Sequence, residues 1–131
     1  MTKFRQLVII SVLVFCCNNL FAQNRDTISE PSQSPTVPYR LFRTTNIWTF
    51  IKLDTITCKM WQVQYSIDGV GGTVVLNDQD LASGKERISG RFTLYPTSNM
   101  WTFILIDQIE GNTWQVQWSQ ERRNRLVLPI N

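Results

Sequence analysis

The sequence has no histidine among its 131 residues. This removes the commonest general base, the usual zinc ligand and the residue that orients a Ser-His-Asp triad. No acidic cluster has the spacing of a calcium loop, and no glycine-rich segment has the pattern of a phosphate-binding loop. We therefore predict a protein that is not an enzyme, with no catalytic residue, metal site or cofactor.

Cysteine is scarce, and two of its three residues, Cys16 and Cys17, lie at the end of an apolar N-terminal run. Residues 1–22 have the pattern of a signal peptide: a basic start, an apolar core and a small residue, Ala22, before the expected cleavage point. Lipid attachment at Cys16 or Cys17 is an alternative, but the bulky Phe15 disfavours it. We expect a secreted or periplasmic protein with no membrane span once the signal is removed.

The segment that follows, residues 23–38, is polar and contains three prolines. Such a composition favours a flexible linker, and residues 39–131 then form a single domain. Without the signal peptide, eleven basic residues face ten acidic ones, so nothing indicates a nucleic-acid partner. Cys58 becomes the only cysteine, which excludes an intramolecular disulfide.

Most of this domain is an internal duplication. Residues 41–66 align without a gap on residues 94–119, and 14 of the 26 aligned pairs are identical. We define the two repeats as 40–77 and 91–131. The most conspicuous matches are Trp-Thr-Phe-Ile at 48–51 and 101–104, and Trp-Gln-Val-Gln at 61–64 and 114–117.

Within each repeat the apolar residues alternate with polar ones, which predicts strands and not helices. An aspartate, Asp54 or Asp107, begins a short turn between the two tryptophan-containing strands, and Gly111 suits the left-handed position that closes it. Cys58 takes the place of that glycine in the first repeat. The predicted fold is all-β: eight antiparallel strands in two four-stranded meanders, forming a barrel or a sandwich with pseudo-twofold symmetry, or else a pair of propeller-like blades.

The Trp-Thr-Phe-Ile…Asp…Trp-Gln-Val-Gln pattern resembles that of small exported proteins of the Gram-negative envelope, which are of uncharacterised function. The resemblance covers residues 40–131, and the signal-like ending Phe-Ala-Gln at 21–23 agrees with it. The hairpin is also faintly similar to one blade of a quinoprotein-type propeller. The resemblance implies an exported β-protein and brings no activity or site residue with it.

Two kinds of side chain in the duplicated strands are candidates for ligand binding. Aromatic rings next to glutamines can form a platform for a glycan or a peptide, although large rings of this kind also build cores. The glutamine rows can line a polar cavity or a solvated face. The candidate ligand-binding residues are Gln62, Gln64, Gln115, Gln117, Tyr65 and Trp118.

The function that we expect is a non-catalytic binding or interaction domain, whose partner is an envelope protein or a glycan. One alternative is a self-assembling structural envelope protein, a homo-oligomer built through exposed strand edges. A second is a hydrolase that uses Asp54, Asp107 or Glu110, although the two aspartates also fit a structural role in their turns.

Overall fold

A computed structural model describes Ser34 and residues 36–131. The chain divides into two units, Met1–Ser32 and Gln33–Asn131. The predicted signal peptide and most of the predicted linker therefore lie outside the described residues. Within the part that is described, no helix has the length and hydropathy that a membrane crossing requires.

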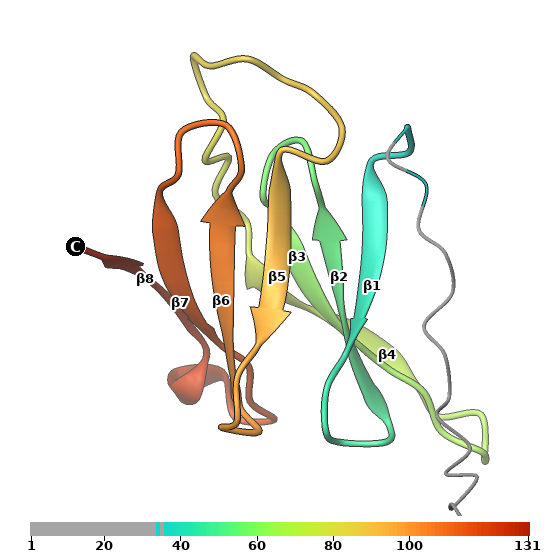
Figure 1. The fold of residues 1–131 in the computed structure, drawn as a ribbon. Helices are drawn as coiled ribbons and strands as arrows, with labels where there is room; N and C mark the ends of the chain where they lie inside the picture. The colour runs from blue at the N-terminus through green and yellow to red at the C-terminus, as the bar shows by residue number, and fades with distance from the viewer. Residues whose placement is uncertain (1–33, 35) are drawn as a thin grey trace, which may run out of the picture. The chain divides into compact units, whose positions relative to one another are not determined.

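The second unit consists of two four-stranded antiparallel meanders, as the duplication predicted (Figure 1). The first sheet contains β1 (Tyr39–Arg43), β2 (Thr49–Asp54), β3 (Met60–Gln64) and β4 (Gly72–Asn77). The second contains β5 (Phe92–Pro96), β6 (Thr102–Asp107), β7 (Thr113–Gln117) and β8 (Leu126–Ile130). Each sheet follows chain order, so the eight-strand, all-β fold is confirmed. The two sheets form a sandwich and do not close into a barrel.

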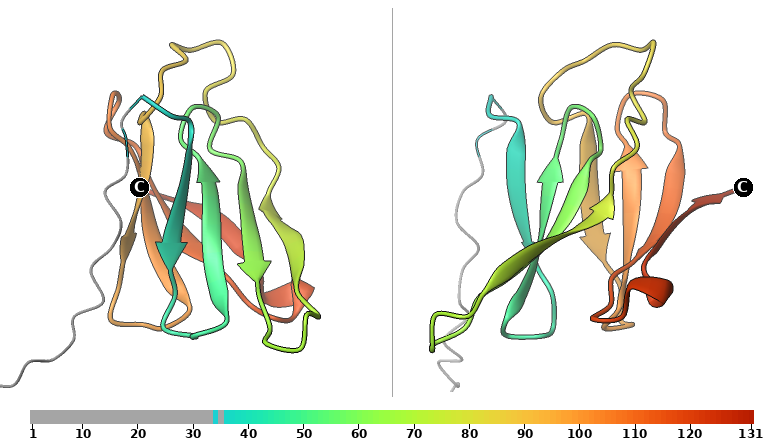
Figure 2. Two further views of the ribbon diagram at one scale, coloured as in Figure 1. Left: turned by 90° about the vertical axis from the view of Figure 1, so that its right-hand side faces the viewer. Right: turned by 180° about the vertical axis from the view of Figure 1, so that it is seen from behind.

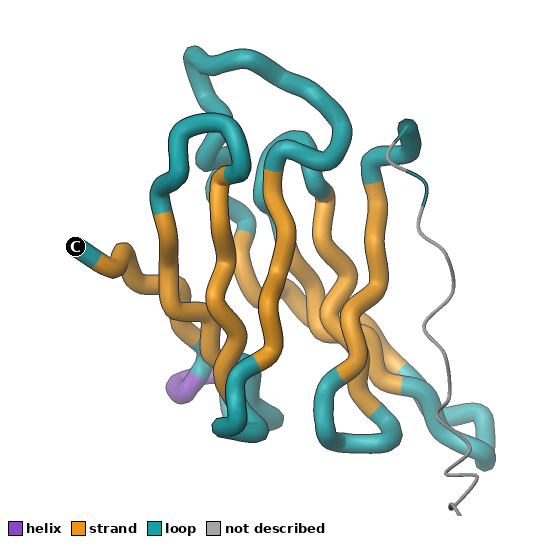
Figure 3. Tube along the Cα trace, in the orientation of Figure 1, coloured by secondary structure: helices purple, strands orange, loops and turns teal. Residues whose placement is uncertain are grey.

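The connections are turns and loops, apart from one 3-10 turn, η1 (Arg122–Asn124), among the described residues (Figure 3). The loop from β4 to β5 arches over the end of the sandwich at which the β2–β3 and β6–β7 turns lie. It contains turns but no helix.

The two sheets stack in the same order and in the same sense. In Figure 1, β1 and β5 point downwards and β2 and β6 point upwards. The two views in Figure 2 place β1 and β5 at one edge of the sandwich and β4 and β8 at the other. A twofold axis between two facing sheets would reverse either the strand direction or the strand order. The sheets are therefore related as successive layers of a stack.

Burial along the strands shows the same relation. In β2 the buried residues are Thr49, Ile51 and Leu53, whereas in β6 they are Phe103, Leu105 and Asp107. These are not equivalent positions, because Phe103 corresponds to Phe50 and Ile51 corresponds to Ile104. Successive side chains of a strand point to opposite faces. The two repeats therefore bury opposite faces, and the pseudo-twofold relation expected from the duplication is replaced by front-to-back packing.

The core lies between these two non-equivalent faces. We call the face of each sheet that points towards the other sheet its inner face, and the opposite one its outer face. The buried apolar residues come from both inner faces and from the turns that flank them. They are Ile51, Leu53, Cys58, Met60, Leu76, Ala82, Phe92, Leu94, Phe103, Leu105, Val116 and Trp118.

Candidate functional site

The six residues predicted to bind a ligand are distributed over the inner and outer faces of both sheets. Gln62 is buried in the inner face of the first sheet, and its side-chain amide exchanges two 3.1 Å hydrogen bonds with the backbone of Ser119. It therefore joins the two sheets. Trp118 is fully buried on the inner side of the second sheet, where its indole Nε1 donates a 3.0 Å hydrogen bond to the carbonyl oxygen of Met100. Both side chains are used by the fold itself.

The other four predicted residues are more accessible but do not lie together. Tyr65 lies on the outer side of the first sheet, and its ring packs against those of Trp48 and Phe50. Gln64 is exposed at the end of β3, with the inner-face register of that strand. Gln115 and Gln117 belong to the outer face of the second sheet, and Gln117 donates a 3.0 Å hydrogen bond to the carbonyl oxygen of Asn124. The glutamine rows thus do not line one shared cavity.

The two aspartate turns form as the sequence predicted. In the first, Asp54 Oδ1 accepts hydrogen bonds from the N–H groups of Ile56 and Thr57 at 2.9 and 3.3 Å. In the second, Asp107 Oδ1 accepts equivalent bonds at 3.0 and 3.2 Å. The residue that closes each turn has positive φ: +71° at Cys58 and +78° at Gly111. The turns superpose in conformation, and the non-glycine Cys58 carries the strain of the left-handed region.

Cys58 is also part of the core. Its side chain is fully buried, and that burial, together with the negative charges of Asp54 and Asp107, raises the pKa of its thiol far above the ordinary value. The thiolate is the reactive form of cysteine. Cys58 is therefore built to be an inert core residue.

Among the residues that the structure describes, the second turn has an ion pair that the first lacks. Both Arg91 and Asp107 are about 1% exposed, and the guanidinium donates to Asp107 Oδ2 from Nη2 at 2.6 Å and from Nε at 3.1 Å. A further donor of Arg91 reaches the carbonyl oxygen of Glu86 at 2.6 Å. In the first repeat, Pro38 occupies the position equivalent to Arg91. Arg91 was not among the predicted functional residues. The only signal in the sequence that could have indicated this pairing is that Arg91 belongs to the same repeat as Asp107, one of the two duplicated aspartates.

The charges of this cluster are mutually compensated. Burial alone would raise the pKa of Asp107, but the bonds from Arg91 and from the Ile109 and Glu110 N–H groups outweigh it and hold that pKa below its ordinary value. Glu110 pairs with Lys85 at 2.5 Å and with Arg91 at 3.1 Å. A carboxylate held in this way is a poor general base. The geometry therefore favours a structural role for Asp107, which lends no support to a hydrolytic one.

The outer face of the first sheet gathers four aromatic rings, of which Tyr39 and Tyr65 are exposed and Phe50 and Trp61 half-buried. By strand register it presents Tyr39, Leu41, Phe50, Lys52, Trp61, Val63 and Tyr65. Tyr39 packs against Trp61 with ring centroids 6.5 Å apart. The Lys52 ammonium lies 4.5 Å from the Trp61 ring centroid, and the Arg43 guanidinium lies 5.8 Å from that of Phe50. Aromatic rings covered by cations in this way combine apolar area with limited conformational freedom.

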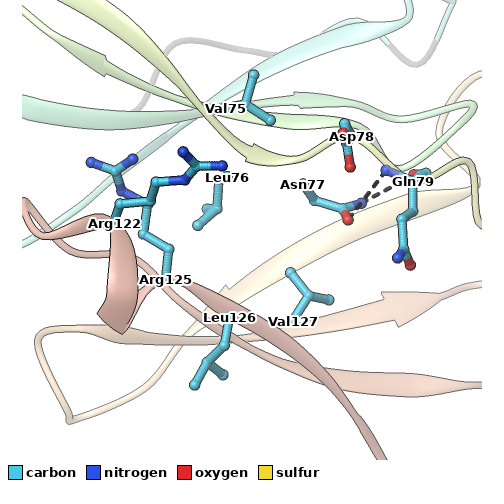
Figure 4. A pocket seen from close by; sticks show the side chains of 9 residues that line it. All are labelled: Val75, Leu76, Asn77, Asp78, Gln79, Arg122, Arg125, Leu126 and Val127. Carbon is cyan, nitrogen blue, oxygen red and sulfur yellow. Dashed lines mark hydrogen bonds between the residues drawn. The ribbon is translucent and has the colours of Figure 1, made fainter.

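A crevice lies between β4 and β8 (Figure 4). It has a volume of about 610 Å³ and is mostly polar, with Leu76 and Asn77 on one wall and Arg122 and Arg125 on the other. Arg125 donates to the backbone oxygens of Ser119 and Gln120 at 2.8 and 2.9 Å, so its guanidinium holds the preceding loop. Asn77 donates to the carbonyl oxygens of Cys58 and Gln79, which fixes the opposite wall.

No group of three or more histidine, cysteine or acidic side chains among the described residues could hold a metal ion. Comparison of the chain with protein-family models, curated proteins and solved structures finds no match. The outer face of the first sheet is therefore the candidate functional site, on its geometry alone.

Proposed function

We propose that this chain is an exported, non-catalytic interaction domain that binds its partner through the outer face of the first sheet. The observation that carries the proposal is the degree of exposure of the large apolar residues on this face. Tyr39 is 55% exposed, Leu41 49% and Tyr65 48%. A contiguous apolar patch of this kind on a small domain marks an interaction site.

The composition of the face favours a protein partner over a glycan. Tyrosine, tryptophan and arginine are the residues enriched at the energetic centres of protein interfaces. A glycan platform needs flat, accessible rings with polar neighbours, but Phe50 and Trp61 are only half-exposed and have Arg43 and Lys52 over them. The sheet also supplies a rigid scaffold, which reduces the entropy lost when a partner binds.

The test measures binding of an immobilised chain to a fraction of envelope proteins and to a panel of glycans. Replacing Tyr39 and Tyr65 together by serine removes two rings of the face. Binding of the protein partner should weaken by about tenfold or more, since residues at an interface centre contribute at least 1.4 kcal/mol, or one decade of affinity.

Ile67→Ser provides the control, because Ile67 is 90% exposed and lies in the β3–β4 loop, outside the strands of this sheet. It should bind as the unmodified chain does. Circular dichroism verifies that both variants are folded. Equal binding by the unmodified chain and the double variant, or a preference for glycans that both share, would overturn the proposal.

A further inference from the structure

We infer that the partner of this face is a second copy of the same chain, which stacks on it head to tail as the second sheet stacks on the first within one chain. This inference rests on the function proposed above and specifies the partner. It differs from association through strand edges, because the contact is between sheet faces.

An exposed face of the molecule is equivalent in sequence to a buried one. The outer face of the first sheet has the same strand positions as the inner face of the second, most of which is buried. Tyr39 is 55% exposed, whereas its equivalent Phe92 is buried. Leu41 is 49% exposed and Leu94 only 4%. Tyr65 is 48% exposed and its equivalent Trp118 is buried, so the exposed face is a second copy of a surface that already binds a sheet.

A matching surface lies at the other end of the stack, on the outer face of the second sheet. The outer face of the second sheet has the same strand positions as the inner face of the first. Ile104 corresponds to the buried Ile51, and Gln115 corresponds to Gln62, whose amide joins the sheets. Tyr95, which is 57% exposed, corresponds to Phe42, which packs against the core. Each molecule thus exposes, on its two outer faces, the counterparts of both inner faces that meet between its own sheets.

The backbone repeats this complementarity. Within the chain, the Phe92 N–H donates a 2.9 Å hydrogen bond to the carbonyl oxygen of Thr55, which joins β5 to the β2–β3 turn. Thr55 is fully buried, and its equivalent Gln108 is exposed. In a stack of two molecules, the equivalent donor is the Tyr39 N–H of one and the equivalent acceptor is the Gln108 carbonyl oxygen of the other.

A contact between the outer face of one molecule's first sheet and the outer face of another's second sheet joins two different surfaces. An interface between two different surfaces is heterologous: it leaves one copy of each surface unused, so it continues into a ring or a filament. A face-to-face twofold dimer would instead use the same face twice. Because the two sheets of one chain are already related heterologously, addition of a further chain repeats a relation that the fold has shown to be sterically allowed.

The differences between the repeats make the contact between chains weaker than the contact within one. Lys52 replaces Leu105, Tyr39 replaces Phe92, and Thr113 on the other outer face replaces Met60. Each of these replacements puts a polar group where the interface within the chain has an apolar side chain, while the strands around it stay the same. The long Lys52 side chain can lay its apolar stem across the interface and hold its ammonium at the rim. We therefore expect reversible association, with a dissociation constant of about 10 µM or above, as for small interfaces.

The experiment is complementation between two variants of the full chain, measured by sedimentation at concentrations from about 5 to 500 µM, a range that brackets the expected affinity. Tyr39→Asp blocks one outer face and Tyr95→Asp blocks the other. The unmodified chain should form species of two or more copies. Each variant alone should be monomeric, and an equimolar mixture should form a dimer, because each variant retains the surface that the other has lost.

Leu41→Asp and Leu128→Asp form a second pair on the same two faces, for use if a first variant does not fold; Leu128 is 52% exposed. A monomeric unmodified chain at 500 µM would overturn the inference, and the proposed function would survive if the serine variants still lost their foreign partner. Dimers of Tyr95→Asp alone would show a symmetric contact, which would also overturn it. Failure of the mixture to form dimers, with both variants folded, would do the same.

Discussion

Replacing Phe103 with alanine is expected to lower the free energy of unfolding by about 3–5 kcal/mol, because the ring is buried between the sheets and its loss leaves a cavity. The same change at Phe50 should cost about 1 kcal/mol or less, since that ring is half-exposed and mainly contacts Arg43 and Tyr65. The two phenylalanines have identical neighbours in sequence, Trp-Thr before and Ile after. Urea unfolding of both variants measures the difference.

The isoleucines that follow them should show the reverse order. Ile51→Ala removes a fully buried side chain and should cost about 2–5 kcal/mol, whereas Ile104→Ala acts on the outer face and should cost less. Local strand propensity cannot produce this crossover, because it is the same in both repeats. Equal losses for Phe50→Ala and Phe103→Ala would mean that the repeats use equivalent faces, contrary to the packing described here.

The second large effect is expected for Asp107→Asn. This change keeps an oxygen for the turn hydrogen bonds but removes the buried charged partner of the Arg91 guanidinium, which is then left with only the more exposed Glu110. Removing one partner of a buried ion pair is strongly destabilising, and we expect a loss of about 3 kcal/mol. Thermal unfolding should shift downwards by roughly 15 °C for a domain of this size.

Asp54→Asn is the matched control, because Asp54 performs the same turn chemistry without an arginine at the equivalent position. Its cost should stay within about 1 kcal/mol. Equal losses in the two variants would show that the turn, and not the ion pair, requires the carboxylate of Asp107.

The pH dependence follows from the same pair. The folded-state pKa of Asp107 lies below its ordinary value, so ionised Asp107 stabilises the fold. That contribution is complete above the unfolded-state pKa of about 3.9 and is lost as the pH falls below it towards the folded-state pKa. The unmodified chain should therefore lose more stability than Asp107→Asn between pH 5 and the acid limit.

The duplication made the strands and turns predictable. Alternating apolar residues predicted eight strands in two meanders, and the aspartate turns were placed correctly because a carboxylate oxygen can cap two backbone donors there. These features depend on local chemistry, which the two repeats share. The positive φ of Cys58 follows for the same reason, since Gly111 marks the conformation.

The choice of face could not be predicted in this way. Trp61 and Trp114 occupy the same place in the Trp-Gln-Val-Gln motif, and a tryptophan-in, glutamine-out arrangement fits β7, where Val116 and Trp118 are buried. It fails for β3, where Gln62 is buried and the Trp61 ring lies on the outer face. The neighbouring strands β2 and β6 carry apolar side chains on both faces, so alternation alone does not show which face is buried. The way in which the two sheets stack decides which face is buried, and this stacking is a tertiary property that the pattern of one strand does not contain.

The choice of ligand-binding residues from the sequence was limited for the same reason, because the sequence does not show which face of each sheet is buried. Gln62 and Trp118 have the residue types of a binding platform, yet their positions on inner faces make them part of the sandwich. Tyr65 retains the predicted exposure because its repeat presents the opposite face. The candidate site was therefore identifiable as aromatic from the sequence, but its members could be chosen only once the stacking was known.

The central claim, that equivalent residues of the two repeats face opposite ways, is tested most directly by hydroxyl-radical footprinting of the unmodified chain in dilute solution. Mass spectrometry of separate peptides gives the oxidation rates of Phe50 and Phe103, and of Ile51 and Ile104. We predict that Phe50 is oxidised faster than Phe103 and Ile104 faster than Ile51, as their exposures require. The same order of rates within both repeats would contradict the account.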